Sequence, residues 1–550
     1  MSDTPHSILF RNGFVHSPTD PFATALFIED GVIAWIGDDD TSTSFASRAE
    51  KVIDVDGALI APGFVDAHVH LLETELAYRA VDVSPSAGGT SREAVLDLIR
   101  DRLSAGGVGQ ARALSTTGYD DSGWSGPGVT VHDLDTTFGD VPLYVPRADL
   151  HSAVCSTALL RAAGLDESAL SDGRLINRSH TAVRDHIRDV SAEERDDIYR
   201  SILARAASLG FVAVHENSAI GIDTREGLAR LIELTTDSSS GLPLVVGYRG
   251  ELVSTDDELA QIQQQVPGLR GLAGDLSADG SIGSRSAAMR EPYADAPSTS
   301  GTLHLSEEQI YTHLLICSSK GITAGFHVIG DRALDTVLAA ARRLATEPGM
   351  LSAMRRGGHR LEHVELVDSE SIAALVELGF AVSVQPAFDA YWGGEGDLYE
   401  QRLGASRRAR TTPIRDFSRA GVPMAFGSDT PVTALDPWGA VAAALFHNNR
   451  DFRISARAAF KAHTRGGWRV GGEPNFMAGE LRVGAPAHLA LWRADELGVQ
   501  AENDGRSSWT TDARSGSPLL PILEQEAISR GQRPQCVATL REGVFLYNTL

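Results

Sequence analysis

The middle of the chain alternates short apolar segments with amphipathic ones, and this alternation constrains the fold more than any other feature. Between residues 61 and 470, apolar runs of strand length recur, separated by helical stretches such as 193–210 and 332–347. Near-continuous apolar strands that alternate with helices indicate a parallel sheet covered on both faces. Eight such units predict an α/β fold of the TIM type, a (β/α)8 barrel spanning 61–470.

Nine segments fit the strand pattern, one more than such a barrel needs. They are 63–70, 141–149, 210–218, 243–250, 271–280, 321–330, 359–367, 380–388 and 422–432. We exclude 141–149 because the residues around it are rich in Gly, Ser, Thr and Asp, as in an insertion over the barrel mouth. A barrel of this length exceeds the typical ~250 residues, so we expect a long insertion, 75–200.

Both ends of the chain show a different sequence pattern. Short apolar runs are broken by turn signals such as RNG (11–13) and EDG (29–31), and similar runs return in GAPAHLALW (484–492). Two strand-rich ends that flank an α/β middle predict a small β-sandwich domain, formed by residues 1–60 together with residues 471–550.

Charge and cysteine content exclude several classes of partner. The formal net charge of −24 argues against nucleic acid and against anionic membranes. The three cysteines, Cys155, Cys317 and Cys536, are far apart and form no CxxC pair, which argues against disulfides and cysteine zinc sites. We see no signal-peptide pattern and no apolar run of ~18 residues, so we expect a cytoplasmic protein.

Ionisable residues stand where four of the predicted strands end. His68 and His70 are two residues apart on the first strand, so their side chains share one face. His327, His363 and Asp429 end three later strands. In a (β/α)8 barrel the carboxyl ends of the strands converge on the active-site face. The pattern therefore predicts that these side chains meet in one site.

Imidazoles with a carboxylate indicate a divalent metal, with Zn favoured and Fe, Mn or Ni as alternatives, as one or two ions. Such a metal lowers the pKa of a bound water toward ~7. Asp429 is then the predicted catalytic acid/base, which accepts the proton of that water and returns it to the leaving group. His363, or the metal itself, polarises the scissile carbonyl. We expect hydrolysis at an electrophilic carbon of a small molecule.

The predicted ligands lie in longer motifs: GFVDAHVHL (63–71), GITAGFHVIGDRA (321–333), HRLEHVEL (359–366) and GSDTPV (427–432). These segments, together with GYDDSGW (118–124), resemble the amidohydrolase superfamily over nearly the whole chain. The resemblance is strongest to its Amidohydro_3 branch, the YtcJ-like proteins that include N-substituted formamide deformylases. The resemblance implies metal ligation by four histidines and an aspartate: His68, His70, His327, His363 and Asp429.

Position 275 departs from the pattern of that family. Many members carry a lysine on the fourth strand, four residues before a DGS motif, which can be carbamylated to bridge two metals. Here the position holds Asp275, and the three lysines of the chain offer no substitute. We therefore expect either a mononuclear site or a second metal that is bound by Asp275, with a hydrogen-bonded Asp275 as the structural alternative.

Substrate binding is assigned to polar or aromatic residues near the predicted strand ends or in loops. These residues are His151, Asp279, Arg285, Trp124 and Gln385. The resemblance places His151 near the substrate. Each has a structural alternative: a surface histidine, a residue that satisfies a loop, or an aromatic that only packs.

Three functions fit these observations. We favour a hydrolase of carbon–nitrogen bonds in a non-peptide amide or formamide. A deaminase or lactonase would use the same metal site with a different pocket. A non-catalytic binding or regulatory protein is the third alternative, and the intact set of five ionisable residues argues against it. The expected partner is a small-molecule substrate, and a homodimer is left open.

Overall fold

The computed structural model describes the chain except residues 1–4, 106–111, 122–123, 148–151, 171–172 and 502–516. The chain divides into two compact units. The first comprises Met1–His70, Leu203–Ile220 and Thr224–Leu550, and the second comprises Leu71–Ile202 and Gly221–Asp223. All the predicted metal ligands lie in the first unit.

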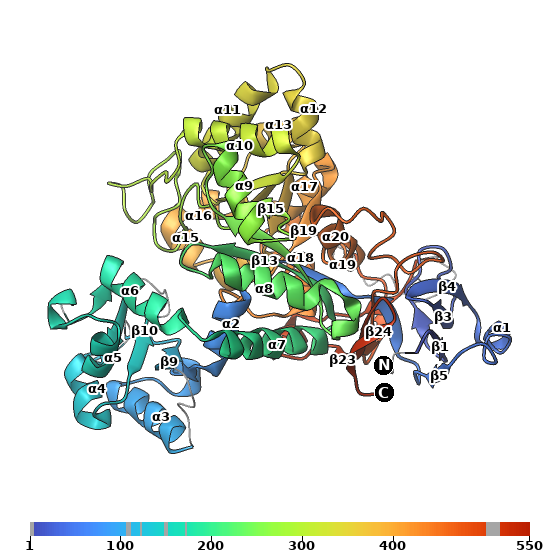
Figure 1. The fold of residues 1–550 in the computed structure, drawn as a ribbon, viewed down its shortest axis with the longest axis horizontal. Helices are drawn as coiled ribbons and strands as arrows, with labels where there is room; N and C mark the ends of the chain where they lie inside the picture. The colour runs from blue at the N-terminus through green and yellow to red at the C-terminus, as the bar shows by residue number, and fades with distance from the viewer. Residues whose placement is uncertain (1–4, 106–111, 122–123, 148–151, 171–172, 502–516) are drawn as a thin grey trace. The chain divides into compact units, whose positions relative to one another are not determined.

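Eight parallel strands form the centre of the first unit (Figure 1). In sheet order they are β7 (Phe64–Val69), β13 (Phe211–Ala219), β14 (Leu244–Gly250), β15 (Gly271–Leu272), β16 (Thr323–Val328), β17 (Arg360–His363), β18 (Ala381–Val384) and β19 (Met424–Phe426). A parallel bridge between Val69 and Thr430 joins the first strand to the last. The sheet therefore closes into a TIM-like barrel, and each of the eight strands overlaps one of the eight retained segments.

Helices follow the barrel strands along the chain. They are α8 (Arg225–Thr236), α9 (Asp256–Gln265), α10 (Glu307–Lys320), α11 (Asp331–Ala345), α12 (Met350–Gly357), α13 (Ser369–Leu378), α14 (Pro386–Trp392), α15 (Leu398–Leu403), α16 (Ala405–Arg408), α17 (Ile414–Ala420), α18 (Pro437–Leu445), α19 (Ala456–Ala462) and α20 (Arg465–Val470). Helix α11 shows the pattern that makes them amphipathic. It buries Leu334, Val337, Leu338 and Ala341, which share one face of a helix at three- and four-residue spacing.

The fourth strand is much shorter than predicted. The expected strand 271–280 is reduced to β15, two residues long. The chain then turns at Gly274, whose φ is +78° and where a Cβ atom would lie 2.5 Å from Oδ1 of Asn217. Only glycine fits such a position without strain. The prediction of a long fourth strand was wrong because this turn ends it and places Asp275 in a loop.

Strands from both termini form two further sheets in the first unit. One has the order β4-β3-β1-β5 and the other the order β2-β6-β20-β23-β24. Their bounds are β1 (Ser7–Arg11), β2 (Phe14–Val15), β3 (Ala25–Glu29), β4 (Val32–Gly37), β5 (Lys51–Asp54), β6 (Leu59–Pro62), β20 (Leu489–Arg493), β23 (Gln535–Arg541) and β24 (Val544–Asn548). Ile8 and Leu26 of one sheet share a buried apolar cluster with Ile60 and Leu489 of the other.

The second unit has a sheet of its own, with the order β12-β11-β10-β9-β8. Its strands are β8 (Val81–Asp82), β9 (Leu114–Thr117), β10 (Leu143–Pro146), β11 (Ser152–Cys155) and β12 (Leu175–Ile176). Its helices include α2 (Leu71–Arg79), α3 (Arg92–Ser104), α4 (Val131–Phe138), α5 (Thr157–Ala162) and α6 (Asn177–Arg188). The excluded ninth candidate, 141–149, corresponds to β10 and is no part of the barrel.

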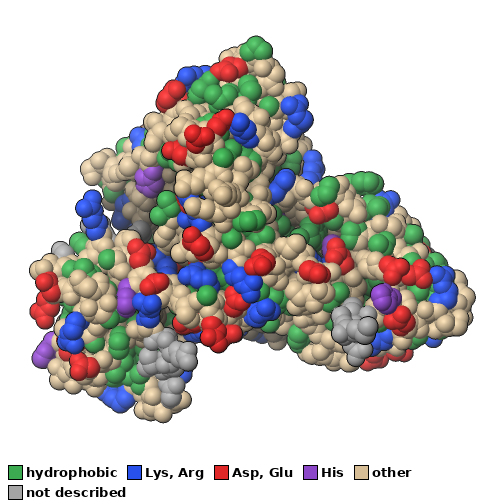
Figure 2. All heavy atoms as spheres, in the orientation of Figure 1, with side chains coloured by type: hydrophobic (Ala, Val, Ile, Leu, Met, Phe, Trp, Pro, Cys, Tyr) green, Lys and Arg blue, Asp and Glu red, His purple; other side chains and the backbone are tan. Residues whose placement is uncertain are grey.

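The surface mixes charges of both signs. On the face drawn in Figure 2, acidic and basic side chains are interspersed, although the chain as a whole carries a formal net charge of −24. Among the helices that the described residues form, none has the length and apolar character needed to cross a membrane.

Candidate metal centre

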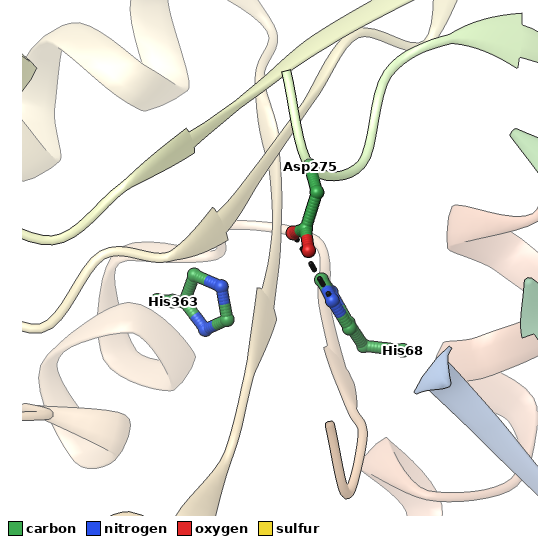
Figure 3. Close-up of side chains that lie close together, drawn as sticks. All are labelled: His68, Asp275 and His363. Carbon is green, nitrogen blue, oxygen red and sulfur yellow. Dashed lines mark ion pairs between the residues drawn. The ribbon is translucent and has the colours of Figure 1, made fainter. Parts of the chain in front are cut away.

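Five side chains meet at the carboxyl ends of the barrel strands: His68, His70, Asp275, His363 and Asp429. Two groups of three have potential ligand atoms within 4.8 Å of one another, one made of His68, Asp275 and His363 and the other of His68, His70 and Asp429. His68 belongs to both groups, so the two sets form one continuous cluster. Figure 3 shows His68 and Asp275 pointing toward each other, with His363 beside them.

The two carboxylates of this cluster face the same pair of imidazoles. Nε2 of His70 lies 3.1 Å from Oδ1 of Asp429 and 3.2 Å from Oδ2 of Asp275. Nε2 of His68 lies 3.4 Å from Oδ1 of each aspartate. All four side chains are at least four-fifths buried. His68 and His70 thus point to the same side, as their two-residue spacing on the first strand predicts.

Left-handed backbone conformations place two of these side chains. His363 has φ +70° and Asp429 has φ +56°. Such values are uncommon outside glycine and concentrate at functional sites. Adjacent residues of an extended strand point to opposite faces, so Glu362 and His363 could not both reach the interior from a regular strand. The turn at His363 ends β17 and lets both side chains lie inside the barrel.

A buried aspartate ties the first strand to the loop that carries Asp429. Oδ1 of Asp66 accepts hydrogen bonds from the backbone N–H groups of His68, at 3.1 Å, and Ser428, at 2.9 Å. The neighbouring Gly427 leaves no room for a side chain, since its Cβ would lie 2.6 Å from the backbone nitrogen of His68. These contacts hold His68 and Asp429 at a fixed separation.

Hydrogen bonds behind the cluster fix the orientation of two imidazoles. Nδ1 of His68 donates to Oε2 of Glu362 at 2.9 Å, and Nδ1 of His363 donates to Oε1 of Gln385 at 2.7 Å. Because Nδ1 carries the proton in each ring, Nε2 is left as the potential ligand atom. For His68 this atom faces the two aspartates.

Glu362 is in turn held by a buried arginine. Arg360 donates to Oε1 of Glu362 at 2.6 Å and to Oε2 at 2.8 Å, and also reaches Nδ1 of His215 at 3.0 Å. Arg360 and Glu362 have no exposed surface. Burial alone would raise the pKa of Glu362, but Arg360 and His68 outweigh it and lower that pKa, so the pair is ionic.

The electrostatics of the cluster favour a cation. Burial alone would lower the pKa of His68, but the carboxylates of Asp429 and Asp275 outweigh it and raise the pKa to about 10. Burial would also lower the pKa of His70, but the same two carboxylates outweigh it and raise that pKa well above its ordinary value. Two aspartates thus attract positive charge to the point where the imidazole nitrogens converge.

The donor set fits a divalent metal. Nε2 of His68 and Oδ1 of Asp275 are buried and have no hydrogen-bond partner among the described residues, as atoms that await a ligand would be. Imidazole nitrogens with carboxylate oxygens are ligands that Zn and its first-row neighbours accept. His68, His70, Asp275, His363 and Asp429 would hold such an ion.

His327 lies next to this cluster without joining either group of three. Its ring centroid is 4.5 Å from that of His363, and its Nδ1 lies 3.7 Å from Oδ1 of Asp279. Asp279 has no exposed surface. Its oxygens accept hydrogen bonds from the backbone N–H groups of Ala288, Ile329 and Gly330 at 2.8, 3.0 and 2.8 Å.

Of the other predicted substrate residues that the structure describes, one contacts the cluster and two have their contacts elsewhere. Gln385 binds His363, as described above. Arg285 pairs with Asp295 through Nε and Nη2 at 3.0 and 2.7 Å. Trp124 packs against the apolar core of the second unit, its ring 5.6 Å from that of Tyr119. His151 lies outside the described residues.

Sequence reasoning missed the residues behind the metal ligands. Arg360 and Glu362 alternate along β17, and two charged residues at that spacing inside a predicted barrel strand are the signal for a buried ion pair. Asp66 shares a face with His68 and His70 for the same reason. His215, on β13, contacts Arg360 and so belongs to the same buried network.

A closed (β/α)8 barrel with imidazoles and carboxylates at the carboxyl ends of its strands defines a metal-dependent hydrolase. The chain belongs to the amidohydrolase family, Amidohydro_3, whose profile matches residues 51–547. It is therefore an amidohydrolase, an enzyme that acts on carbon–nitrogen bonds.

Individual relatives are distant. The chain is 24% identical over 448 residues to the putative amidohydrolase YtcJ of Bacillus subtilis, which covers 78% of this chain and 82% of that protein. It is 22% identical over 513 residues to an N-substituted formamide deformylase of Arthrobacter pascens, covering 86% and 91%. An uncharacterized metal-dependent hydrolase from Pyrococcus furiosus has the same fold, with a TM-score of 0.71, 24% identity and coverage of 88% and 98%.

Proposed function

We propose that this amidohydrolase hydrolyses the carbon–nitrogen bond of a small non-peptide amide or formamide, with a divalent metal as cofactor and Asp429 as acid/base. The observation that carries the proposal is the position of Asp429. Its Oδ1 lies 3.1 Å from Nε2 of His70 and 3.4 Å from Nε2 of His68, so the carboxylate borders the place where the ligand atoms converge.

When bound, a divalent metal supplies Lewis acidity that polarises a carbonyl and acidifies water. The residues of the chain supply the proton transfers. Asp429 accepts a proton from the attacking water and returns it to the leaving nitrogen, so that an amine departs and a carboxylic acid remains. Burial alone would raise the pKa of Asp429, but His68 and His70 outweigh it and lower that pKa, which keeps the carboxylate ready to accept a proton.

His68 and His363 have a positioning part in this scheme. Their Nδ1 hydrogen bonds to Glu362 and Gln385 present Nε2 toward the ligand site in a fixed orientation. Asp275 lies 3.4 Å from Nε2 of His68 and 3.2 Å from Nε2 of His70, and we propose it as a ligand, with Zn as the favoured ion. We also propose that the two terminal sheets, which share one apolar cluster, form a β-sandwich.

The substrate class rests on the similarity to the formamide deformylase of Arthrobacter pascens. Purified protein, loaded with Zn, would be assayed for hydrolysis of N-alkyl and N-aryl formamides, cyclic amides, lactones and amino-heterocycles, with substrate and products separated by chromatography. We expect turnover of a formamide or amide, loss of activity with a chelator and recovery when metal is restored. Turnover of lactones or amino-heterocycles alone would replace this assignment, and chelator-resistant turnover would exclude the metal from the reaction.

A further inference from the structure

A pocket of about 320 Å³ opens at the amino-terminal side of the barrel strands. Its walls include Leu244 at the start of β14, Arg270 immediately before β15, Trp468 of α20, and the residues Gly472 and Glu473. The amino-terminal ends of parallel barrel strands lie opposite the ends that carry the metal cluster. This pocket is therefore separate from the candidate metal centre.

Arg270 has an unusual environment for an arginine of this chain. Its side chain makes no hydrogen bond or ion pair with any described residue, and its Nε is buried. By contrast, the buried Arg360 has Glu362 as its counterion. A guanidinium carries five N–H donors and is always charged, so a partly buried one without a counterion is a site for an anion.

Gly472 makes room for this guanidinium. A Cβ atom at position 472 would lie 1.6 Å from Nη2 of Arg270, and the backbone there has φ +74°, which favours glycine. The wall of the pocket is thus shaped around the charged end of Arg270. The guanidinium is held at the pocket and is not extended into solvent.

Trp468 also lines this pocket. Trp468 is only 3% exposed, and its indole Nε1 is buried without a hydrogen-bond partner among the described residues. Ile232 and Leu244 supply apolar wall beside Trp468 and Arg270.

We propose that this pocket binds a small organic monocarboxylate, whose carboxylate pairs with Arg270 and whose apolar body packs against Trp468 and the aliphatic wall. The planar fork of a guanidinium matches the two oxygens of a carboxylate. Glu473 also lines this pocket, and its negative charge disfavours a dianion such as phosphate. The volume lies at the lower end of the range for small-ligand sites. The inference goes beyond the proposed function and does not depend on it.

The test uses the metal-loaded enzyme and 4-fluorobenzoate as probe, with binding followed by ¹⁹F NMR. The neutral 4-fluorobenzamide has the same apolar body and is the matched control ligand. We expect saturable binding of the carboxylate, and Arg270→Gln to weaken it at least about tenfold, because a charge-assisted pair is lost. Arg469→Gln, which removes the same charge from an exposed position of α20, should leave the affinity unchanged.

A carboxylate that binds only to the metal centre would have the same affinity in Arg270→Gln as in the wild type, and that result would overturn the proposal. Equal binding of 4-fluorobenzamide, or no saturable binding of 4-fluorobenzoate, would also overturn it. If Arg270→Gln fails to fold, Glu473→Gln provides a second test of the same site. We expect it to tighten carboxylate binding, because a repelling charge is removed, and unchanged affinity would contradict the site.

Discussion

Nδ1 of His68 and Oε2 of Glu362 form a 2.9 Å hydrogen bond across the interior of the barrel, between strands that are not neighbours in the sheet. Arg360 neutralises Glu362 from the other side. The contact links a proposed metal ligand to a buried ion pair, and it determines which nitrogen of His68 faces the cluster.

Replacing Glu362 should therefore weaken metal binding, although Glu362 is not itself a proposed ligand. We expect Glu362→Gln to lower the metal affinity by about 10- to 100-fold, since the partner that orients a ligating histidine usually contributes that much. Competition with a chelating dye measures the affinity of the folded protein. The control is Glu370→Gln on α13, whose side chain is 85% exposed. Equal metal affinity in both variants would show that the Glu362 contact has no part in metal binding.

Asp275 is the residue that decides between one ion and two. Because Asp275 reaches both His68 and His70, we expect Asp275→Ala to reduce the metal bound per chain, measured by elemental analysis after dialysis. Asp256→Ala, on the exposed start of α9, should retain the wild-type content. Identical metal content in wild type and Asp275→Ala would remove Asp275 from the ligand set.

Asp279 should matter for stability. Its carboxylate accepts three backbone hydrogen bonds in a fully buried loop, so Asp279→Ala leaves buried N–H groups without partners. We expect a loss of about 3–5 kcal/mol in the free energy of unfolding, measured by denaturant titration. Asp335→Ala removes a half-exposed carboxylate that pairs with Arg290 and should cost about 1 kcal/mol or less. A loss at Asp279 no greater than at Asp335 would contradict this role.

The stability of the protein should depend on pH through His463. Its Nδ1 donates to the carbonyl of Val65 at 3.0 Å, and burial lowers its pKa to about 4. The unfolded chain binds this proton near pH 6.5 and the folded chain only near pH 4, so stability falls as pH drops between those values. Between pH 7 and pH 4, we expect the free energy of unfolding of His463→Asn to fall by about 3 kcal/mol less than that of the wild type. If wild type and variant had the same pH dependence of stability, the fold would not lower the pKa of His463.

The barrel and much of the side-chain cluster were predictable from the sequence, because strand periodicity places His68, His70 and Asp429 at or just after strand ends. The short fourth strand was not, since the turn at Gly274 depends on the contact with Asn217, far away in sequence. The pairing of Arg360 with Glu362 and His68 also required the closed barrel. The roles expected for Arg285 and Trp124 depended on loop positions, which periodicity does not determine.

Asp429→Asn tests the central claim most directly, because it preserves the size of the side chain and removes its ability to accept a proton. The measurement is kcat for amide or formamide hydrolysis, together with metal content, in wild type and variant. The account predicts a fall in kcat of about 10²- to 10⁴-fold, with metal retained through the remaining ligands. A metal-loaded Asp429→Asn variant with the kcat of the wild type would contradict it.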